Sequence, residues 1–391
     1  MIAAAWVFGP QETAYADGAR VDIAHAQEAN HVVTAPTTRG QAVLTVDPEL
    51  QRDVDALLDQ ARASEGAIVV IDVRTGRALA WASNDPSGRD LVATPYAPPA
   101  SLFKVVTAAA LIEDENVPPT AHQCYVGGQR SARLSNLRSS GAGGARCETF
   151  DTAVGYSRNM VMAGLAVRHL EAPALRTWAR NLGFTGNIPA DVDVEPGELT
   201  VQDSKEGVAR AAAGFGEGKL SVLGAAYMMS IIANGGVRPQ VSLIDYLVGP
   251  EGQHLDAPFS PGAGERVLRV STARRLTSML EVTVREGTAA HAFRDLSGNR
   301  YLGRFGGVGK TGTLARGNPG RLFSWYAGFA PAQNPQVAVA VMLANGNQWW
   351  RKANEVARDV LRSYFSRQHG SGVTNPIRGR RASSGQASRR R

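Results

Sequence analysis

Ser101 and Lys104 lie three residues apart in the stretch SLFK, which follows a proline-rich loop. Positions i and i+3 share one face of a helix, so the serine hydroxyl and the lysine amine can meet. A serine hydroxyl becomes a nucleophile when a base takes its proton, and a buried lysine with a lowered pKa can be that base. The spacing therefore favours acyl transfer, although Ser101 could instead be a helix N-cap.

A second polar group follows 56 residues later, where Ser157 and Asn159 flank Arg158 just before a helical stretch. A loop hydroxyl and an amide in this position could relay a proton and orient a substrate amide. Both residue types are also common helix caps, so this motif alone does not decide between the two roles. Arg158 either favours an anionic substrate or folds outward.

The third group lies in the stretch GRFGGVGKTGT, which at first suggests a phosphate-binding loop. That loop needs a glycine at position 304, which is Arg304, and it must open a helix, whereas the following residues include two glycines and a proline. The alternative is an edge strand, on which Gly312 lets a substrate backbone approach. Lys310, Thr311 and Thr313 could then bind a carboxylate, unless Lys310 is simply an exposed strand residue.

The elements that must position these motifs follow from apolar periodicity and from turn residues. Asp47-Pro48 predicts the start of a helix, and Arg74, Thr75 and Gly76 predict a hairpin turn. The predicted elements are a strand and helix over 44–64, a hairpin over 66–83, a helix over 101–115, a mostly helical part over 150–235, a helix over 272–293, strands over 324–330 and 336–344, and a final helix over 350–367. Antiparallel hairpins with segregated helices indicate an α/β fold of the α+β type, in which N- and C-terminal strands form one mainly antiparallel sheet beside a helical middle.

Composition suggests one large soluble domain between an N-terminal and a C-terminal segment of different composition. Hydrophobic residues make up 43% of the 391 residues, which is enough for a core. We predict a leader or linker over 1–40, one domain over 41–370 and a disordered basic tail over 371–391. The net charge of the chain is +7, and six arginines of the tail account for six of these charges, so the remainder carries 7 − 6 = +1. No aromatic platform accompanies this tail, so we expect no nucleic-acid partner, and a weak contact with an anionic polymer or membrane stays open.

Export is indicated by the N-terminus and is compatible with the cysteines. A short apolar run precedes Ala14-Tyr15-Ala16, a pattern typical of signal-peptidase sites, so a truncated leader or partial membrane anchor is one interpretation. Cys124 and Cys147 could close a disulfide across what looks like a long surface loop. A metal site with His122 would lack a fourth ligand.

Taken together in this order, the three motifs resemble those of the transpeptidase domain of penicillin-binding proteins, a family of serine D,D-peptidases related to β-lactamases. The resemblance covers about residues 42–367. It extends to the stretches LTVDPELQ, GAIVVIDVRTGRALAWAS, GFGEGKLSVLGAAYMMSIIANGG and MLEVTVREGTA.

The resemblance implies a role for each motif. Ser101 would be the acylated nucleophile and Lys104 its base. Ser157 would pass a proton to the leaving amine, and Asn159 would bind the substrate amide. On the strand, Lys310, Thr311 and Thr313 would hold the C-terminal carboxylate of a D-Ala-D-Ala stem peptide or of a β-lactam, and Gly312 would complete the substrate-binding strand by letting the substrate backbone approach. Backbone N–H groups of Ser101 and Thr313 would form the oxyanion hole.

The implied function is cross-linking of peptidoglycan by a D,D-transpeptidase that β-lactams inhibit, without a metal or cofactor. The substrate lies outside the cytoplasmic membrane, so we expect an extracytoplasmic location and a glycosyltransferase or other cell-wall synthase as partner.

A D,D-carboxypeptidase is the first alternative. A β-lactamase would need a base for water, and EPGELT, with Glu195 and Glu198, only partly imitates the relevant motif because Thr200 replaces an asparagine. A non-enzymatic penicillin-binding sensor or scaffold is the last alternative.

Overall fold

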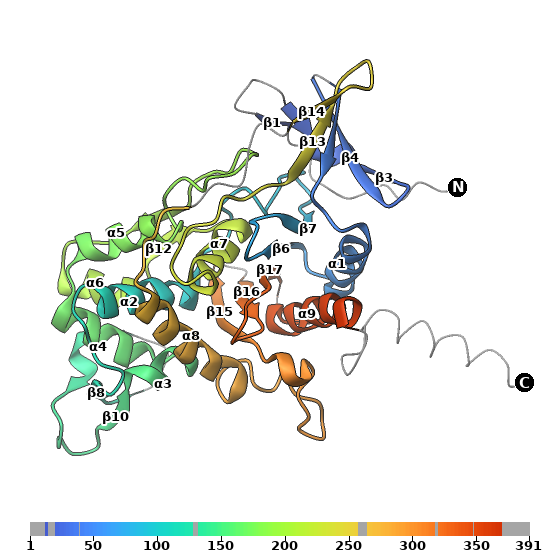
Figure 1. The fold of residues 1–391 in the computed structure, drawn as a ribbon. Coiled ribbons are helices and arrows are strands. Elements are labelled where there is room, and N and C mark those ends of the chain that lie inside the picture. The colour runs from blue at the N-terminus through green and yellow to red at the C-terminus, as the bar shows by residue number, and fades with distance from the viewer. Residues whose placement is uncertain are drawn as a thin grey trace, which may run out of the picture.

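A five-stranded antiparallel sheet lies at the centre of the computed structural model, which describes residues 12–14, 20–38, 40–127, 132–256, 264–316, 320–346 and 348–369. Its strand order is β15–β16–β17–β6–β7 (Figure 1). The strands are β6 (Glu65–Asp72), β7 (Ala78–Asn84), β15 (Val308–Arg316), β16 (Arg321–Ala330) and β17 (Val337–Asn345). The N-terminal hairpin thus joins the C-terminal strands in one sheet, which confirms the predicted α+β architecture.

Strand β17 shows why the sheet is buried on both faces. Its alternate residues enter two different hydrophobic cores, as the two-residue period of a strand requires. Val337, Val339, Val341 and Leu343 belong to one core, and Ala338, Ala340, Met342 and Ala344 belong to the other. Burying each valine or leucine contributes about 1.5–3 kcal/mol, so this apolar run fixes the strand at the centre of the sheet.

Helices cover both faces of the sheet. Helices α1 (Pro48–Ala61) and α9 (Ala353–His369) pack together on one face. Helix α7 (Val222–Ala233) covers the other face and contacts α8 (Val270–Arg285). The predicted start of the first helix is confirmed, because the Asp47 carboxylate accepts hydrogen bonds from the amides of Glu49 and Leu50, both at 2.9 Å.

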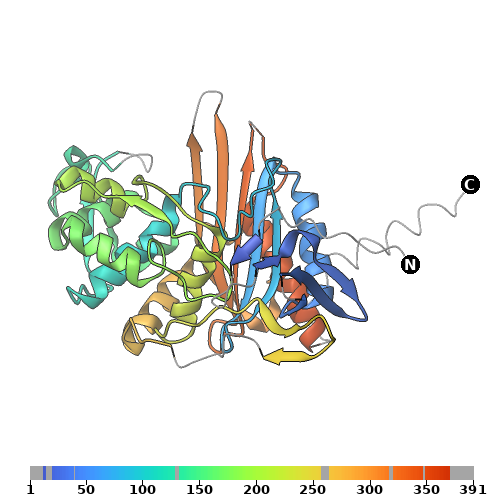
Figure 2. The same ribbon diagram turned by 90° about the horizontal axis from the view of Figure 1, so that it is seen from above.

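The helical middle part of the chain stands to one side of the sheet (Figure 2). It consists of α2 (Phe103–Glu113), α3 (Phe150–Gly155), α4 (Asn159–His169), α5 (Ala172–Asn181) and α6 (Lys205–Ala212). Helix α2 contacts each of the other four and also α8. Ten residues of α2 are buried, so it is the central helix of this part, and Lys104 and Thr107 are the polar residues among those ten.

A second sheet includes short strands from within residues 1–40, the stretch that the sequence predicts to be a leader or linker. It contains β1 (Glu12–Ala14), β2 (Arg20–Asp22), β3 (Gln27–Ala29), β4 (Val32–Thr37), β5 (Gly40–Leu44), β13 (Ile244–Val248) and β14 (His254–Asp256). These strands are short and weakly patterned, and β5 depends on pairing with β13, about 200 residues away. Tyr15 and Ala16 of the suggested cleavage site and the tail 371–391 lie outside the described residues.

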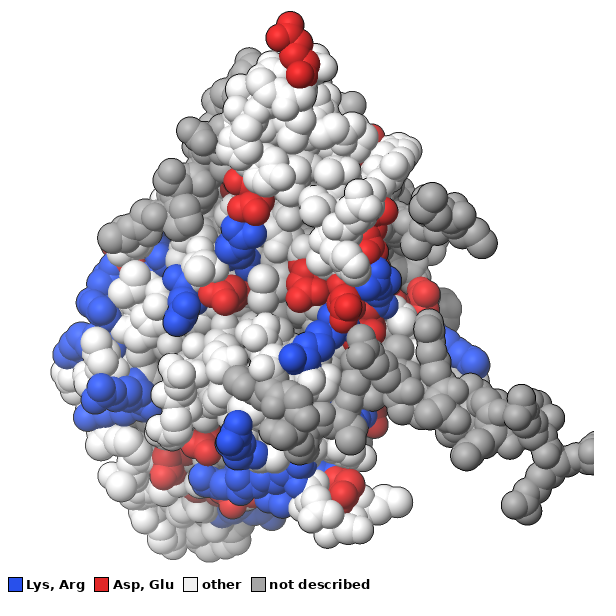
Figure 3. Space-filling view, turned by 45° about the vertical axis from the view of Figure 1, so that its right-hand side comes forward, with Lys and Arg blue, Asp and Glu red and all other residues white. Residues whose placement is uncertain are grey.

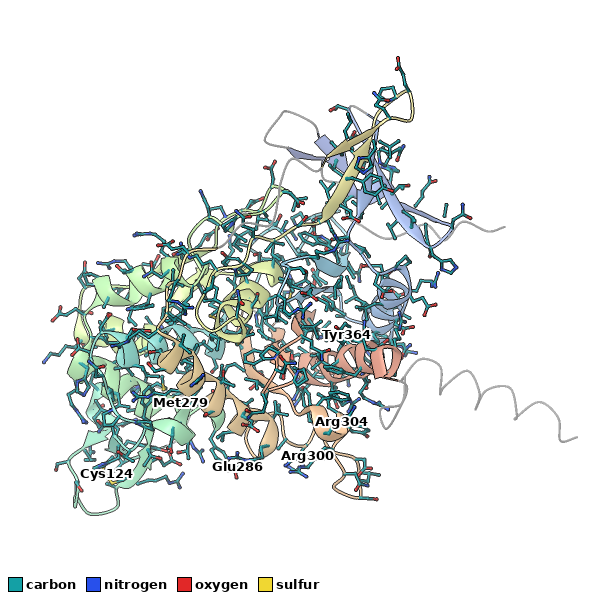
Figure 4. All side chains as sticks on the ribbon, in the orientation of Figure 1. Cys124, Met279, Glu286, Arg300, Arg304 and Tyr364 are labelled. Carbon is teal, nitrogen blue, oxygen red and sulfur yellow. A yellow bond between two sulfur atoms is a disulfide. The ribbon has the colours of Figure 1, made fainter. Side chains whose placement is uncertain are left out.

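The predicted surface loop between the cysteines also contains paired strands. Strands β8 (His122–Tyr125), β9 (Leu137–Arg138) and β10 (Arg146–Thr149) form a small sheet in which Cys124 lies opposite Cys147. The two cysteines form a disulfide at the tip of the helical part, where Figure 4 labels Cys124. Because both sulfurs are bonded to each other, the alternative of a metal site with His122 is wrong.

The surface of the described residues carries charges of both signs. Figure 3 shows Lys and Arg side chains interspersed with Asp and Glu on one face, in keeping with the small net charge expected outside the tail. Within the described ranges, no helix has the length and the apolar content that a membrane span requires.

Candidate active site

Ser101 lies in a short 3-10 turn, Ala100–Leu102, that leads directly into α2. The turn is strained, because Ala100 has a φ of +49°, which a residue with a Cβ seldom adopts. Two glycines make room for it: a Cβ on Gly214 would lie 3.0 Å from the Cα of Ser101, and one on Gly312 would lie 3.2 Å from the carbonyl oxygen of Pro99. Ser101 is therefore held between the end of α6 and the strand of the third motif.

Lys104 is fully buried, and its Nζ lies 2.7 Å from the Oγ of Ser101. The amine also donates to the carbonyl oxygen of Ala213, at 2.6 Å. Burial, together with the nearby charge of Lys310, lowers the pKa of Lys104 well below its usual value. A neutral amine within hydrogen-bonding distance of the hydroxyl can accept its proton, which is what a general base requires.

Lys310 is also fully buried, so the alternative of an exposed strand lysine is wrong. Its Nζ donates to the carbonyl oxygen of Thr311 at 2.9 Å. Burial lowers the pKa of Lys310 to about 7. Among the groups that shift the pKa of these two lysines in the described part of the chain, none is a carboxylate. The site therefore holds two amines in a position suited to an anionic ligand.

The second motif lies between α3 and α4. The backbone of Ser157 has a φ of +57°, and its amide donates to the carbonyl oxygen of Val154 at 3.2 Å. Asn159 begins α4 and is 8% exposed. The motif is linked to the first one through packing, because α4 contacts both α2 and α6.

Arg158 is held by neighbouring side chains of the protein, which favours the second of the two options that the sequence left open. Its Nε lies 2.9 Å from Oε1 of Glu148, on β10. The guanidinium also lies over the ring of Tyr156, 5.3 Å from the centroid. Glu148 accepts a further hydrogen bond from the hydroxyl of Tyr125. The charge of Arg158 is thus already matched by a carboxylate of the protein.

Strand β15 carries the third motif and is the edge strand of the central sheet, as predicted. Lys310 and Gly312 are buried, whereas Thr311 and Thr313 alternate with them and are partly or fully exposed. An unpaired strand edge offers main-chain groups to an extended peptide. The edge and its two hydroxyls therefore form a suitable surface for a peptide that ends in a carboxylate.

Three contacts of the site could not be assigned from the motifs alone. The carbonyl of Ala213 accepts from Lys104, Gly214 packs on Ser101, and the hydroxyl of Thr288 lies 2.5 Å from that of Thr311. In the sequence, these contacts were indicated only by the family-like stretches GFGEGK and REGTA, which lie next to or contain the residues concerned.

The two glutamates of the segment EPGELT contact residues outside the three motifs. Glu198 in β11 (Glu198–Thr200) forms an exposed ion pair with Lys219, and Glu195 accepts a hydrogen bond from Thr94 at 3.3 Å.

The sequence matches the family described as the penicillin binding protein transpeptidase domain over residues 66–362. Since this match covers about three quarters of the chain, the protein belongs to that family. It is 28% identical over 326 residues to stage V sporulation protein D of Bacillus subtilis, covering 77% of this chain and 49% of that protein. It is 26% identical over 341 residues to peptidoglycan D,D-transpeptidase PbpA of Mycobacterium tuberculosis, covering 78% and 68% of the two chains.

Solved structures show the same fold. The apo form of penicillin-binding protein 3 from M. tuberculosis aligns with a TM-score of 0.70 at 23% identity, covering 96% of this chain and 90% of that one. PbpA from M. tuberculosis aligns with a TM-score of 0.64 at 23% identity, covering 81% and 79%. The chain thus spans about half the length of the sporulation protein and about two thirds of PbpA.

Proposed function

We propose that this protein is a serine D,D-transpeptidase that cross-links peptidoglycan stem peptides and is inhibited covalently by β-lactams. The observation that carries the proposal is the distance of 2.7 Å between Ser101 Oγ and the Nζ of a fully buried lysine whose pKa is lowered. Membership of the family supports it, and so do relatives named as peptidoglycan D,D-transpeptidases.

In the proposed acylation step, the amine of Lys104 takes the proton of Ser101 while Oγ attacks the carbonyl carbon of the penultimate D-alanine. The N–H groups of Ser101 and Thr313 would stabilise the oxyanion. When the intermediate collapses, the C–N bond breaks, and Ser157 would pass a proton to the leaving amine of the terminal D-alanine. Asn159 would hold the substrate amide during both events.

Binding of the donor would depend on the third motif. Its terminal carboxylate would face Lys310 and the hydroxyls of Thr311 and Thr313. An anion close to Lys310 favours the charged form of its amine, so donor binding would raise the pKa of Lys310 from about 7. Carboxylate recognition and protonation of Lys310 would therefore be coupled.

In the second step, an amine of a neighbouring stem peptide would attack the acyl-enzyme and free Ser101. A β-lactam would acylate the same serine, but its leaving amine stays attached to the acyl group and blocks the acceptor. We infer that the protein acts outside the cytoplasm, because its relatives in cell-wall synthesis act there. Its substrates would be the stem peptides of glycan strands that a glycosyltransferase supplies. Residues 41–370 would form the catalytic unit.

The test is labelling with a fluorescent penicillin, with and without Ser101→Ala, followed by denaturing gel and intact mass over hours. A stable adduct that the variant lacks is expected. Failure of the unmodified protein to form any adduct would contradict the proposal, and rapid loss of the adduct with hydrolysed drug would indicate a β-lactamase. Stem peptides offered with and without an amine acceptor then distinguish cross-linking from carboxypeptidase activity.

A further inference from the structure

Thr288 contacts the segments that carry the second and third motifs. Its Oγ1 lies 2.5 Å from Oγ1 of Thr311 on β15. The same hydroxyl lies 3.5 Å from the carbonyl oxygen of Gly155, to which the Thr288 amide donates at 3.3 Å. Gly155 ends α3, two residues before Ser157. One threonine thus joins two walls of the site that are more than 150 residues apart in sequence.

The backbone around Thr288 is fixed by close packing. A Cβ on Gly155 would lie 2.5 Å from Cγ1 of Val282, and one on Gly287 would lie 2.9 Å from the carbonyl carbon of Gly155. The amide of Gly287 donates to Val282, at 2.7 Å, and the amide of Ala289 donates to Thr283, at 2.9 Å. The contacts on both sides of Thr288 therefore hold it in place just after the end of α8. Figure 4 labels Glu286, two residues before Thr288.

The hydroxyl pair has a direct consequence for an anion. A threonine hydroxyl has one proton to donate and can also accept. The Thr288 proton can go either to the carbonyl oxygen of Gly155, at 3.5 Å, or to the hydroxyl of Thr311, at 2.5 Å, and the shorter contact is the stronger one. When Thr288 donates to Thr311, the proton of Thr311 is free to point to a carboxylate, and hydrogen bonds arranged in such a chain strengthen one another. Without Thr288, the hydroxyl of Thr311, which is partly exposed, would lose the partner that fixes its orientation.

We propose that Thr288 is a positioning residue for the donor carboxylate, acting through the hydroxyl of Thr311. This inference rests on the proposed function. It predicts that Thr288 affects binding of donors with a free carboxylate and leaves the chemical step at Ser101 nearly unchanged. A neutral hydrogen bond contributes about 1 kcal/mol, so loss of the hydroxyl weakens binding about five- to tenfold.

The test compares Thr288→Val, which keeps the shape and removes the hydroxyl, with Thr288→Ser, which keeps the hydroxyl. Thr277→Val is the matched control, because Thr277 lies on α8 itself and its hydroxyl donates to the carbonyl oxygen of Ala273 within that helix, at 2.8 Å. Stopped-flow acylation separates the dissociation constant of benzylpenicillin from the rate constant of acylation. The methyl ester of benzylpenicillin supplies the same ring without the carboxylate.

We expect Thr288→Val to raise the dissociation constant of benzylpenicillin about five- to tenfold while the acylation rate constant changes less than about twofold. The ester should be affected by neither valine variant, and Thr288→Ser should restore most of the binding. Equal losses for acid and ester, or unchanged binding of the acid, would overturn the inference while the proposed function stands. Thr288→Ala repeats the measurement if the valine variant does not fold, and absence of any adduct on the unmodified protein would reject the proposed function itself.

Discussion

Two clusters of buried charge in this molecule have opposite composition. In the site, Lys104 and Lys310 are both fully buried, and each has a lowered pKa. On α9, the carboxylate of Asp359 is 5% exposed and lies between the guanidinium groups of Arg351, Arg358 and Arg362. One cluster contains like charges, and the other is centred on opposite charges.

The two clusters show how burial changes the pKa of a charged group with and without an oppositely charged partner. Burial raises the pKa of Asp359, but the hydrogen bond and charge of Arg358, with the charges of Arg351 and Arg362, outweigh it, and the net pKa is lowered. That carboxylate stays charged, and its role is to stabilise the fold. Within the residues that the structure describes, no carboxylate shifts the pKa of either lysine, so burial favours their neutral forms, which is the state in which an amine can take a proton.

The largest expected effect is on the chemistry of the like-charged cluster. Lys104→Met removes the proposed base, so acylation by penicillin should fall by about three orders of magnitude, or about 4 kcal/mol, whereas stability should fall only by the lost hydrogen bond to Ala213, about 1 kcal/mol. Stopped-flow acylation and urea unfolding measure the two quantities. A variant that is acylated at the original rate would mean that Lys104 is not the base.

The opposite-charged cluster should show the reverse pattern. Asp359→Ala leaves three arginines without their shared carboxylate and should lower the free energy of unfolding by about 3 kcal/mol, with acylation of the folded protein nearly unchanged. Glu286→Ala is the control, because the ion pair of Glu286 with Arg285 is about half exposed and should contribute less than about 0.5 kcal/mol. Equal losses in the two variants would contradict the role assigned to burial.

Stability should depend on pH through Lys310. Its folded pKa of about 7 lies below that of an unfolded lysine, so between pH 7 and about 10 the unfolded state binds more protons. Stability should therefore rise with pH in this window, by up to about 1.4 kcal/mol per pH unit from this group. Urea unfolding at a series of pH values, compared with Lys310→Met, checks the slope, and identical slopes would reject the lowered pKa.

Acylation should depend on pH in a related way. The proposed base works only when it is neutral, so the rate should rise as pH increases through the lowered pKa of Lys104. The pH dependence of acylation by penicillin tests this directly. A rate that stayed low until pH 10 would show that Lys104 keeps its ordinary pKa.

The smallest effect is expected at a pair of intermediate exposure. Arg158 and Glu148 are 27% and 19% exposed, so Arg158→Gln should cost no more than about 1 kcal/mol of stability. Because the charge of Arg158 is already matched by Glu148, acylation should change less than about twofold. Thermal unfolding and penicillin labelling check both, and a large loss of donor binding would mean that Arg158 contacts the substrate after all.

The local elements and the order of the three motifs could be predicted from the amino-acid sequence alone. Helix α1 begins at its predicted Asp47-Pro48, and the hairpin of β6 and β7 turns at its predicted glycine, because caps, turns and apolar periods act over a few residues. The spacing of Ser101 and Lys104 predicted that a hydroxyl and an amine would meet, since both lie on one helical turn.

Contacts between segments far apart in the chain depend on the folded arrangement and could not be predicted in this way. Lys104 meets Ala213 across 109 residues, β5 pairs with a strand about 200 residues later, and Thr288 reaches both Gly155 and Thr311. No local pattern specifies such partners, because they depend on how the sheet and the helices pack. The same holds for the lowered pKa of both lysines: the sequence supplies two amines, and only folding removes the water around them.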